Sequence, residues 1–136
     1  MIRPIMKDPL FLSQPSEDAG PGDTAVMQDL AETLTAHRAG CVGMAANMIG
    51  VRKNIIAVMV SGLPVIMVNP VITAKSGPYT AREGCLSLPG ERSAQRWQTI
   101  TVSFQDMRFG RHTETYTGTA AQIIQHEIDH CRGILI

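Results

Sequence analysis

The feature that most constrains this chain is an H-E-x-x-H motif at residues 126–130. Positions i and i+4 share one face of an α-helix, so His126 and His130 meet at one point only if these residues are helical. Two imidazoles presented in this way can bind one metal ion, and Glu127 can handle protons on a bound water molecule. An amphipathic helix that happens to carry two histidines is the simpler alternative. Since chance should produce the pattern in well under about one such chain in a hundred, the motif favours a catalytic metal.

Catalytic sites of this kind take three protein ligands and leave one position for water. The further candidates are three cysteines and two histidines: Cys41, Cys85, Cys131, His37 and His112. Cys131 follows His130 directly and is rotated by about 100° from it on the same helix, so we expect it to pack rather than bind. Cys41 stays open as a ligand. Cys85 is the strongest candidate, because residues 82–90 are expected to form a loop whose glycines allow close approach to a ligand. Taken by itself, a lone loop cysteine is more often a buried or inert thiol, and spacing alone does not overturn that reading.

Three segments of the sequence resemble the three motifs of the peptide deformylase family, in the family's order. They are residues 43–50 (GMAANMIG), 83–87 (EGCLS) and 125–130 (QHEIDH). Residues 68–72 and 5–9 are also similar to that family, so the resemblance extends over nearly the whole chain. It implies an α+β fold in which antiparallel β-strands pack around a central helix that carries the HExxH motif. We expect a single deformylase-like domain over residues 1–136.

The resemblance also implies roles for individual residues. It makes Cys85, His126 and His130 the metal ligands, and it makes Glu127 the general base and acid. The backbone N–H of Leu86 is implied to stabilise the oxyanion of the tetrahedral intermediate. The implied reaction is hydrolysis of the formyl group of N-formylmethionyl peptides, which yields formate and a free N-terminus. The residues implied to contact the substrate are Gly43, Met44, Met48 and Gly84.

Met48 departs from the family pattern, which has a glutamine at this position. The glutamine amide donates a second hydrogen bond to the oxyanion, whereas a thioether donates none. Loss of one such donor typically lowers the rate by about a hundred- to a thousand-fold. Asn47 is an adjacent amide, but neighbouring side chains of an extended segment point to opposite faces. The chain is therefore interpreted as a slower deformylase, with a degenerate paralogue that binds metal and formyl-peptide-like ligands as the alternative.

One thiolate and two imidazoles suit Zn²⁺, Fe²⁺, Co²⁺ or Ni²⁺. The resemblance implies one divalent ion, Fe²⁺ in the cell, and an N-formylated peptide or nascent chain as the partner. Three other classes of function stay open. A metallopeptidase would use H-E-x-x-H with another third ligand, and a non-catalytic module would bind formyl peptides without turnover. A structural metal domain would need Cys41 or Cys131 as a fourth ligand.

Charge, hydropathy and cysteine content argue against a nucleic-acid-binding protein, a membrane protein and a disulfide-rich secreted protein. The formal net charge is +0, which gives no reason to expect nucleic acid or an anionic membrane as a partner. The longest purely apolar stretch is residues 55–60, far too short to span a membrane, and no signal peptide is evident. Three cysteines do not make a disulfide framework, and a thiolate ligand requires a reducing compartment. We expect a cytoplasmic protein, and the oligomeric state is not readable from the sequence.

Periodicity and turn residues predict the main elements. The expected helices are residues 24–38, capped by Asp23, and residues 119–131. The expected strands are residues 55–60 and 63–68 around the Ser61-Gly62 turn, then residues 99–104 and 113–117. Residues 1–22 are expected to be mostly irregular.

Four polar side chains near the motifs are also expected to contribute to the site or its surroundings. Gln125 is expected to bond near the metal segment, and Asp129 is expected to orient a histidine ring. Arg92 and Arg96 follow the Cys85 segment and can line a peptide cleft, with solvated surface positions as an equal expectation.

Overall fold

The computed structural model describes residues 1–136 and has the predicted α+β architecture. Its elements, in chain order, are α1 (Pro9–Leu12), the 3-10 helix η1 (Pro21–Asp23), α2 (Thr24–Ala36), β1 (Gly43–Ala45), the 3-10 helix η2 (Ala46–Ile49), β2 (Ile55–Val60), β3 (Leu63–Cys85), β4 (Leu88–Gln105), β5 (Arg111–Thr117) and α3 (Gly118–Cys131). The five strands form one sheet in the order β1-β2-β3-β4-β5, and each strand is antiparallel to the next.

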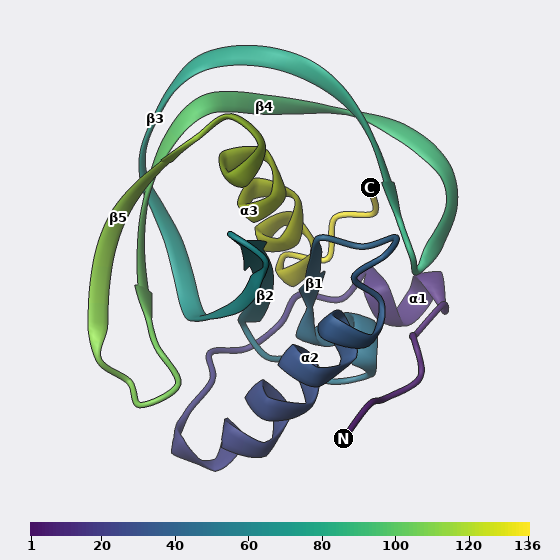
Figure 1. The fold of residues 1–136 in the computed structure, drawn as a ribbon. Helices are drawn as coiled ribbons and strands as arrows, with labels where there is room; N and C mark the ends of the chain where they lie inside the picture. Colours follow the sequence, from purple (N-terminus) through teal and green to yellow (C-terminus); the bar gives the residue numbers. More distant parts are fainter.

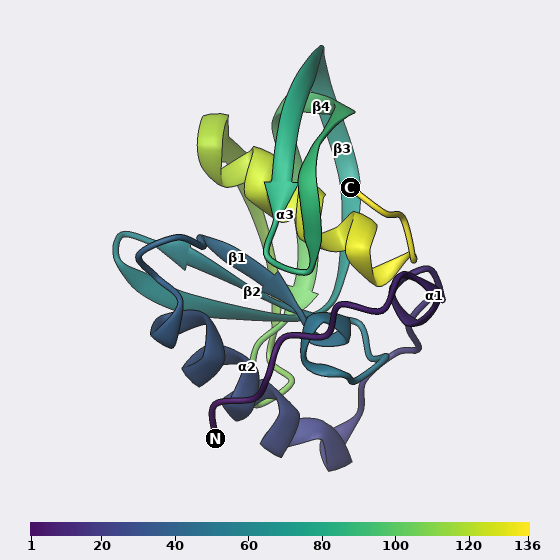
Figure 2. The same cartoon turned by 90° about the vertical axis from the view of Figure 1, so that its right-hand side faces the viewer.

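Strand β2 is apolar throughout because both of its faces are buried. Successive side chains of a strand point to opposite faces, so Ile55 and Ala57 pack in one core cluster and Ile56 and Val58 in another. The first cluster includes Leu30 and other residues of α2. The second cluster contains residues of α3. Helices α2 and α3 therefore cover opposite faces of β1 and β2, as Figure 2 shows.

Helix α3 carries the H-E-x-x-H motif and lies at the centre of the fold. Strands β3 and β4 form a long ribbon that arches over it, and β5 follows the outer side of β4 (Figure 1). The apolar side of α3, formed by Ala121, Ile124 and Ile128, packs against the sheet. This packing confirms the predicted central position of the helix and fixes the rotation of α3, and with it the direction of the motif side chains.

Residues 82–90 are not the loop that the sequence predicted. Strands β3 and β4 remain paired up to Cys85 and Leu88, so only Leu86 and Ser87 form the turn. The pairing of β3 with β4 shifts its register between Val68 and Val71, and again between Gly84 and Cys85. The ladder of backbone hydrogen bonds is irregular at these places. Such irregularities increase bending and twist, which lets the ribbon curve around α3. The cysteine is thus delivered to the motif helix by the tip of a hairpin.

The other predicted helices and strands are confirmed, but β3 and β4 extend far beyond the predicted residues 63–68 and 99–104. The Ser61-Gly62 turn joins β2 to β3, and both residues have positive φ, 52° and 80°, as a type I′ hairpin turn requires. The predicted strands 99–104 and 113–117 lie inside β4 and β5. The prediction that Asp23 caps α2 through its side chain is wrong, because its carboxylate accepts from the backbone N–H of Gly20 instead. None of the helices is long and apolar enough to cross a membrane.

Candidate metal centre and active site

The side chains of Cys85, His126 and His130 converge at one point between the β3–β4 tip and α3. Their ligand atoms all lie within 4.8 Å of one another, and no further Cys, His, Asp or Glu belongs to the group. The two histidine Nε2 atoms are 3.0 Å apart. Two nitrogens bound at about 2.0–2.1 Å to one tetrahedral ion would lie about 3.3 Å apart. The three donors therefore fit a single metal ion, and neither Cys41 nor Cys131 joins them as a fourth ligand.

Glu83 sets the tautomer of His126. Its Oε1 lies 2.8 Å from Nδ1 of His126, so Nδ1 donates to the carboxylate and Nε2 is the nitrogen that faces the other ligands. Desolvation would raise the pKa of Glu83, but hydrogen bonds from His126, Arg96 and Gln122 outweigh it and lower the pKa to about 2. The carboxylate is therefore ionised at neutral pH. A carboxylate–histidine pair of this kind is the usual support of a metal-binding imidazole.

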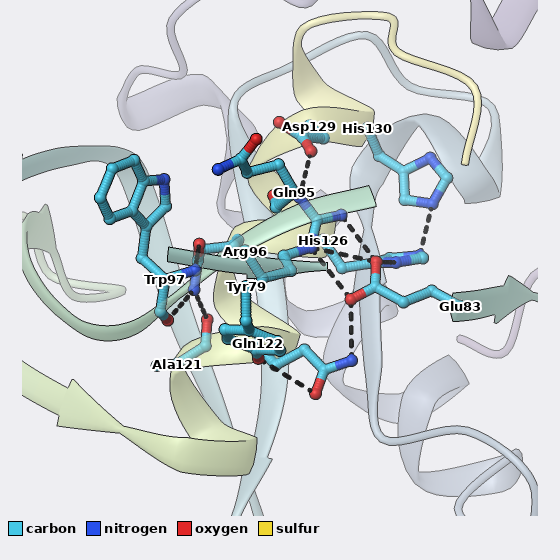
Figure 3. A network of polar contacts seen from close by, with 11 residues as sticks. Tyr79, Glu83, Gln95, Arg96, Trp97, Ala121, Gln122, His126, Asp129 and His130 are labelled. Carbon is cyan, nitrogen blue, oxygen red and sulfur yellow. Dashed lines mark hydrogen bonds and ion pairs between the residues drawn. The ribbon is translucent and has the colours of Figure 1, made fainter. Parts of the chain in front are cut away.

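Arg96 is buried beside Glu83 and anchors it. Its guanidinium donates to Glu83 through Nη2 at 2.6 Å and through Nε at 3.0 and 3.1 Å, and its Nη1 donates to Asp129 at 2.7 Å (Figure 3). Only 3% of Arg96 is exposed, so the expectation of a surface or cleft-lining residue is wrong. Gln122 completes the network by donating to Oε2 of Glu83 at 2.8 Å. The network links β3, β4 and α3 directly behind His126.

Sequence reasoning missed the roles of Glu83 and Arg96. Glu83 lies two residues before Cys85, and residues i and i+2 of a strand share a face. The loop predicted for residues 82–90 conceals this signal, because the i, i+2 relation holds only in a strand. Asp129 was expected to orient a histidine and instead binds Arg96. Gln125 was expected near the metal segment, but it bonds the backbone of Trp97, accepting from N–H at 2.8 Å and donating to the carbonyl at 2.9 Å.

The two histidines have opposite charge preferences. Burial lowers the pKa of His130 to about 3, so this imidazole is neutral and ready to bind a cation. Desolvation also lowers the pKa of His126, but hydrogen bonds with Cys85 and Glu83 outweigh it and raise the pKa to about 10. A metal at Nε2 of His126 must displace that proton, because a ligating imidazole is deprotonated.

Glu127 lies beside the ligands without joining them. It is 4% exposed, and burial raises its pKa to about 7. Its Oε1 is buried without a hydrogen-bond partner, as is Nδ1 of His130. Since an unpartnered buried polar atom is costly, an acceptor left free at this place points to a ligand or water that it serves. A carboxyl with a pKa near neutrality can both take up and return a proton at physiological pH.

Gly43 provides the space that Glu127 occupies. A Cβ at this position would lie 2.6 Å from Cγ2 of Ile123 and 2.8 Å from Oε2 of Glu127. Both distances are shorter than real Cβ contacts, so any side chain would displace the carboxylate. The glycine in the first motif is therefore required by its close approach to α3.

We expect Gly43→Ala to lower kcat by about a hundred-fold, because a displacement of roughly 1 Å in a catalytic group has that effect. The metal content should not change, since the atoms nearest to the new methyl group belong to Ile123 and Glu127 and to none of the three ligands. The assay is hydrolysis of a formyl peptide together with metal analysis. Gly22→Ala is the control, because nothing lies within 4 Å of a Cβ there. An unchanged kcat in Gly43→Ala would contradict the steric argument.

A cleft of about 920 Å³ opens over the ligands. Most of the predicted site residues line it: Gly43, Met48, Gly84, Cys85, Leu86, His126 and Glu127. Leu86 is at the hairpin turn, and 37% of it is exposed. His130 lies behind them and is completely buried. The structure thus places a substrate-sized cavity on the side of the ligand group where Glu127 also lies.

Met44 does not take the position expected of a substrate contact. It is completely buried, belongs to the core cluster beside α2 and does not line the cleft. The physical reason is the alternation of β1: Gly43 faces α3, so Met44 faces the opposite side. The predicted extended conformation at residues 47–48 is also wrong, because Asn47 and Met48 lie in η2. Asn47 donates to the carbonyl of His130 at 2.8 Å and so supports the motif helix.

The remaining cysteines lie outside the group of Cys85, His126 and His130. Cys131 is 5% exposed and packs in the core, and burial raises its pKa to about 12. Cys41 lines the cleft, where its thiol donates to the carbonyl of Gly43 at 2.9 Å. Burial raises the pKa of Cys41 to about 11. Both thiols therefore stay protonated at neutral pH and neither joins the metal-binding group.

Comparison with known proteins adds an independent finding. Residues 2–136 match the family model described as polypeptide deformylase. The chain is 51% identical to a peptide deformylase of Clostridium beijerinckii over the full length of both chains. It is 33% identical to one from Chlorobaculum tepidum, with 99% of this chain and 78% of that protein covered.

Solved structures agree with the sequence comparisons. The crystal structure of a peptide deformylase from Legionella pneumophila matches with a TM-score of 0.89 at 31% identity, and covers 99% of this chain and 83% of that one. The crystal structure of the peptide deformylase from Thermotoga maritima matches with a TM-score of 0.88 at 28% identity. This match covers 99% of this chain and 95% of that one.

Proposed function

This chain belongs to the peptide deformylase family, and from that membership we propose that Cys85, His126 and His130 hold its catalytic metal and that Glu127 transfers the protons. The protein is a metal-dependent hydrolase of N-formylmethionyl peptides. The observation that carries the residue assignment is the convergence of one thiol and two imidazoles beside a buried carboxyl with a free acceptor oxygen. We propose that residues 1–136 do this as one domain.

The family uses a divalent metal, and Fe²⁺ is our proposal for the ion in the cell, with Zn²⁺, Ni²⁺ and Co²⁺ as alternatives that the same donors accept. When bound, the ion supplies Lewis acidity that activates water and polarises the formyl oxygen. A cytoplasmic location is part of the proposal, because the Cys85 thiolate needs a reducing environment. The proposed partner is an N-formylated peptide or nascent chain. Nucleic acid and membrane have no place in the proposal.

Two groups of the protein have separate roles in the reaction: Glu127 transfers protons, and the backbone of Leu86 stabilises the negative charge that develops on oxygen. Glu127 accepts the proton of the attacking water at Oε1, which has no other partner in the structure. The backbone N–H of Leu86 donates to the oxygen that becomes negative as the formyl carbon turns tetrahedral. Glu127 then delivers its proton to the amide nitrogen as the C–N bond breaks. Formate and the free amino group of methionine are the products.

The test is formate release from a formyl-methionyl tripeptide by anaerobically iron-loaded protein. Chelated protein and Cys85→Ser are the matched controls, because both remove the metal or one of its ligands. Turnover that is lost in both controls supports the proposal. Release at the level of the controls, with metal bound stoichiometrically, would contradict it and leave the degenerate paralogue. Cleavage of an unformylated peptide at an internal bond would indicate a metallopeptidase instead.

Met48 provides a second prediction about rate. Its Sδ accepts from the N–H of Ala45 at 3.5 Å and lines the cleft. In Met48→Gln the same N–H can bond the amide oxygen, which turns the amide NH₂ toward the oxyanion. We expect kcat/KM to rise by about ten-fold or more, a fraction of what one oxyanion donor contributes. Equal values of kcat/KM for the variant and the wild type would mean that another group already supplies the second hydrogen bond.

A further inference from the structure

The thioether of Met48 lies at the metal-binding group itself. Its Sδ is 4.0 Å from Sγ of Cys85, and the side chain is only 1% exposed. On the other side, the N–H of Ala45 holds the sulfur at 3.5 Å. The sulfur is thus fixed in the wall of the cleft and directed at the thiol ligand.

The spacing of the two sulfurs matches a shared cation. Two sulfur ligands bound at about 2.3 Å to one tetrahedral ion lie about 3.8 Å apart. Sγ of Cys85 and Sδ of Met48 are 4.0 Å apart in the structure. The thioether sulfur has two lone pairs, and it accepts from the N–H of Ala45 and from the thiol of Cys85. When Cys85 binds a metal as the thiolate, it no longer donates, and the second lone pair of Met48 becomes free. Packing alone does not require sulfur at this position, because leucine has nearly the same volume.

We propose that Met48 is a fourth, weakly held donor to the metal, and that the site for this reason favours soft or borderline cations over hard ones. This inference rests on the ligand set proposed above. Thiolate and thioether ligands select Cu⁺ and Zn²⁺, and two histidines, one cysteine and a distant methionine form a donor set that binds copper. The neutral thioether competes with water for the fourth position, which would slow hydrolysis in addition to the loss of an oxyanion donor.

The experiment is X-ray absorption at the metal edge of anaerobically Cu⁺-loaded protein, combined with a chelator competition for Cu⁺ and for Zn²⁺. Wild type, Met48→Leu and Met27→Leu are compared. Met27 is completely buried in the same core cluster as Met48, so its variant controls for packing. Leu and Met exchange at a cost of less than about 1.5 kcal/mol, so both variants should fold.

We expect two sulfur and two nitrogen neighbours in wild type and Met27→Leu, and one sulfur in Met48→Leu. The Cu⁺ affinity of Met48→Leu should fall by about ten-fold or more, since even residues outside the ligand set change metal affinity by about 10- to 100-fold. The Zn²⁺ affinity should fall less. One sulfur with two nitrogens in wild type would overturn the role of Met48 and leave the proposed function standing. No sulfur neighbour in wild type would overturn the ligand set itself.

Discussion

Replacement of Glu127 by glutamine is expected to lower kcat for formate release by about 10²- to 10⁴-fold, the usual contribution of a general acid–base group. The amide has almost the volume of the carboxyl, so the buried side chain should keep its place. It cannot accept the water proton at the position where Oε1 has no other partner. The metal content should equal that of wild type, because Glu127 is not one of the three ligands.

The control for Glu127→Gln is Glu114→Gln, which changes an exposed carboxylate of β5 in the same way. It should leave kcat and metal content as they are in wild type. A Glu127→Gln protein that has lost its metal would show that the carboxyl stabilises the site rather than transfers protons. A Glu127→Gln protein with wild-type kcat would show that another group is the base.

Replacement of Arg96 by methionine is expected to destabilise the fold by about 3–5 kcal/mol, because it leaves the buried charge of Glu83 without its main partner. Glu83 is 7% exposed and receives three of the hydrogen bonds of Arg96, so the loss falls on a group that water reaches poorly. Metal affinity should fall by about 10- to 100-fold as well, because Glu83 orients His126. Chemical denaturation and chelator competition measure the two effects.

Arg111→Met is the matched control for Arg96→Met. Arg111 is exposed at the start of β5, so its loss should change the free energy of unfolding by less than about 0.5 kcal/mol. Arg96→Lys should recover little of the lost stability, since the ammonium group of lysine cannot reproduce the planar guanidinium that binds Glu83 and Asp129 together. An Arg96→Met protein as stable as wild type would contradict the view that this ion pair fastens the β3–β4 ribbon to α3.

The motif helix was predictable because its signal is local. His126 and His130 stand at positions i and i+4, and this spacing alone places both on one helical face. The same holds for β2, whose short apolar run ends at the Ser61-Gly62 turn. These predictions were confirmed to within a residue or two.

The hairpin tip was not predictable in the same way. Residues 73–82 of β3 are largely polar and exposed and include Gly77 and Pro78, a composition typical of loops. They form a strand because their backbone pairs with β4 from Thr101 to Ser93. That pairing depends on contacts far along the chain, which no local pattern reports. The contact of Glu83 with Arg96 and the position of Met48 beside Cys85 follow from it.

The measurement that tests the assignment most directly is anomalous X-ray scattering at the metal edge from a crystal of the metal-loaded protein. We predict one strong peak per chain, about 2.0–2.3 Å from Sγ of Cys85 and from Nε2 of both His126 and His130. The nearest oxygen of Glu127 should face the peak without bonding it. A peak elsewhere, or a peak at this place that persists in Cys85→Ser with unchanged occupancy, would contradict the account.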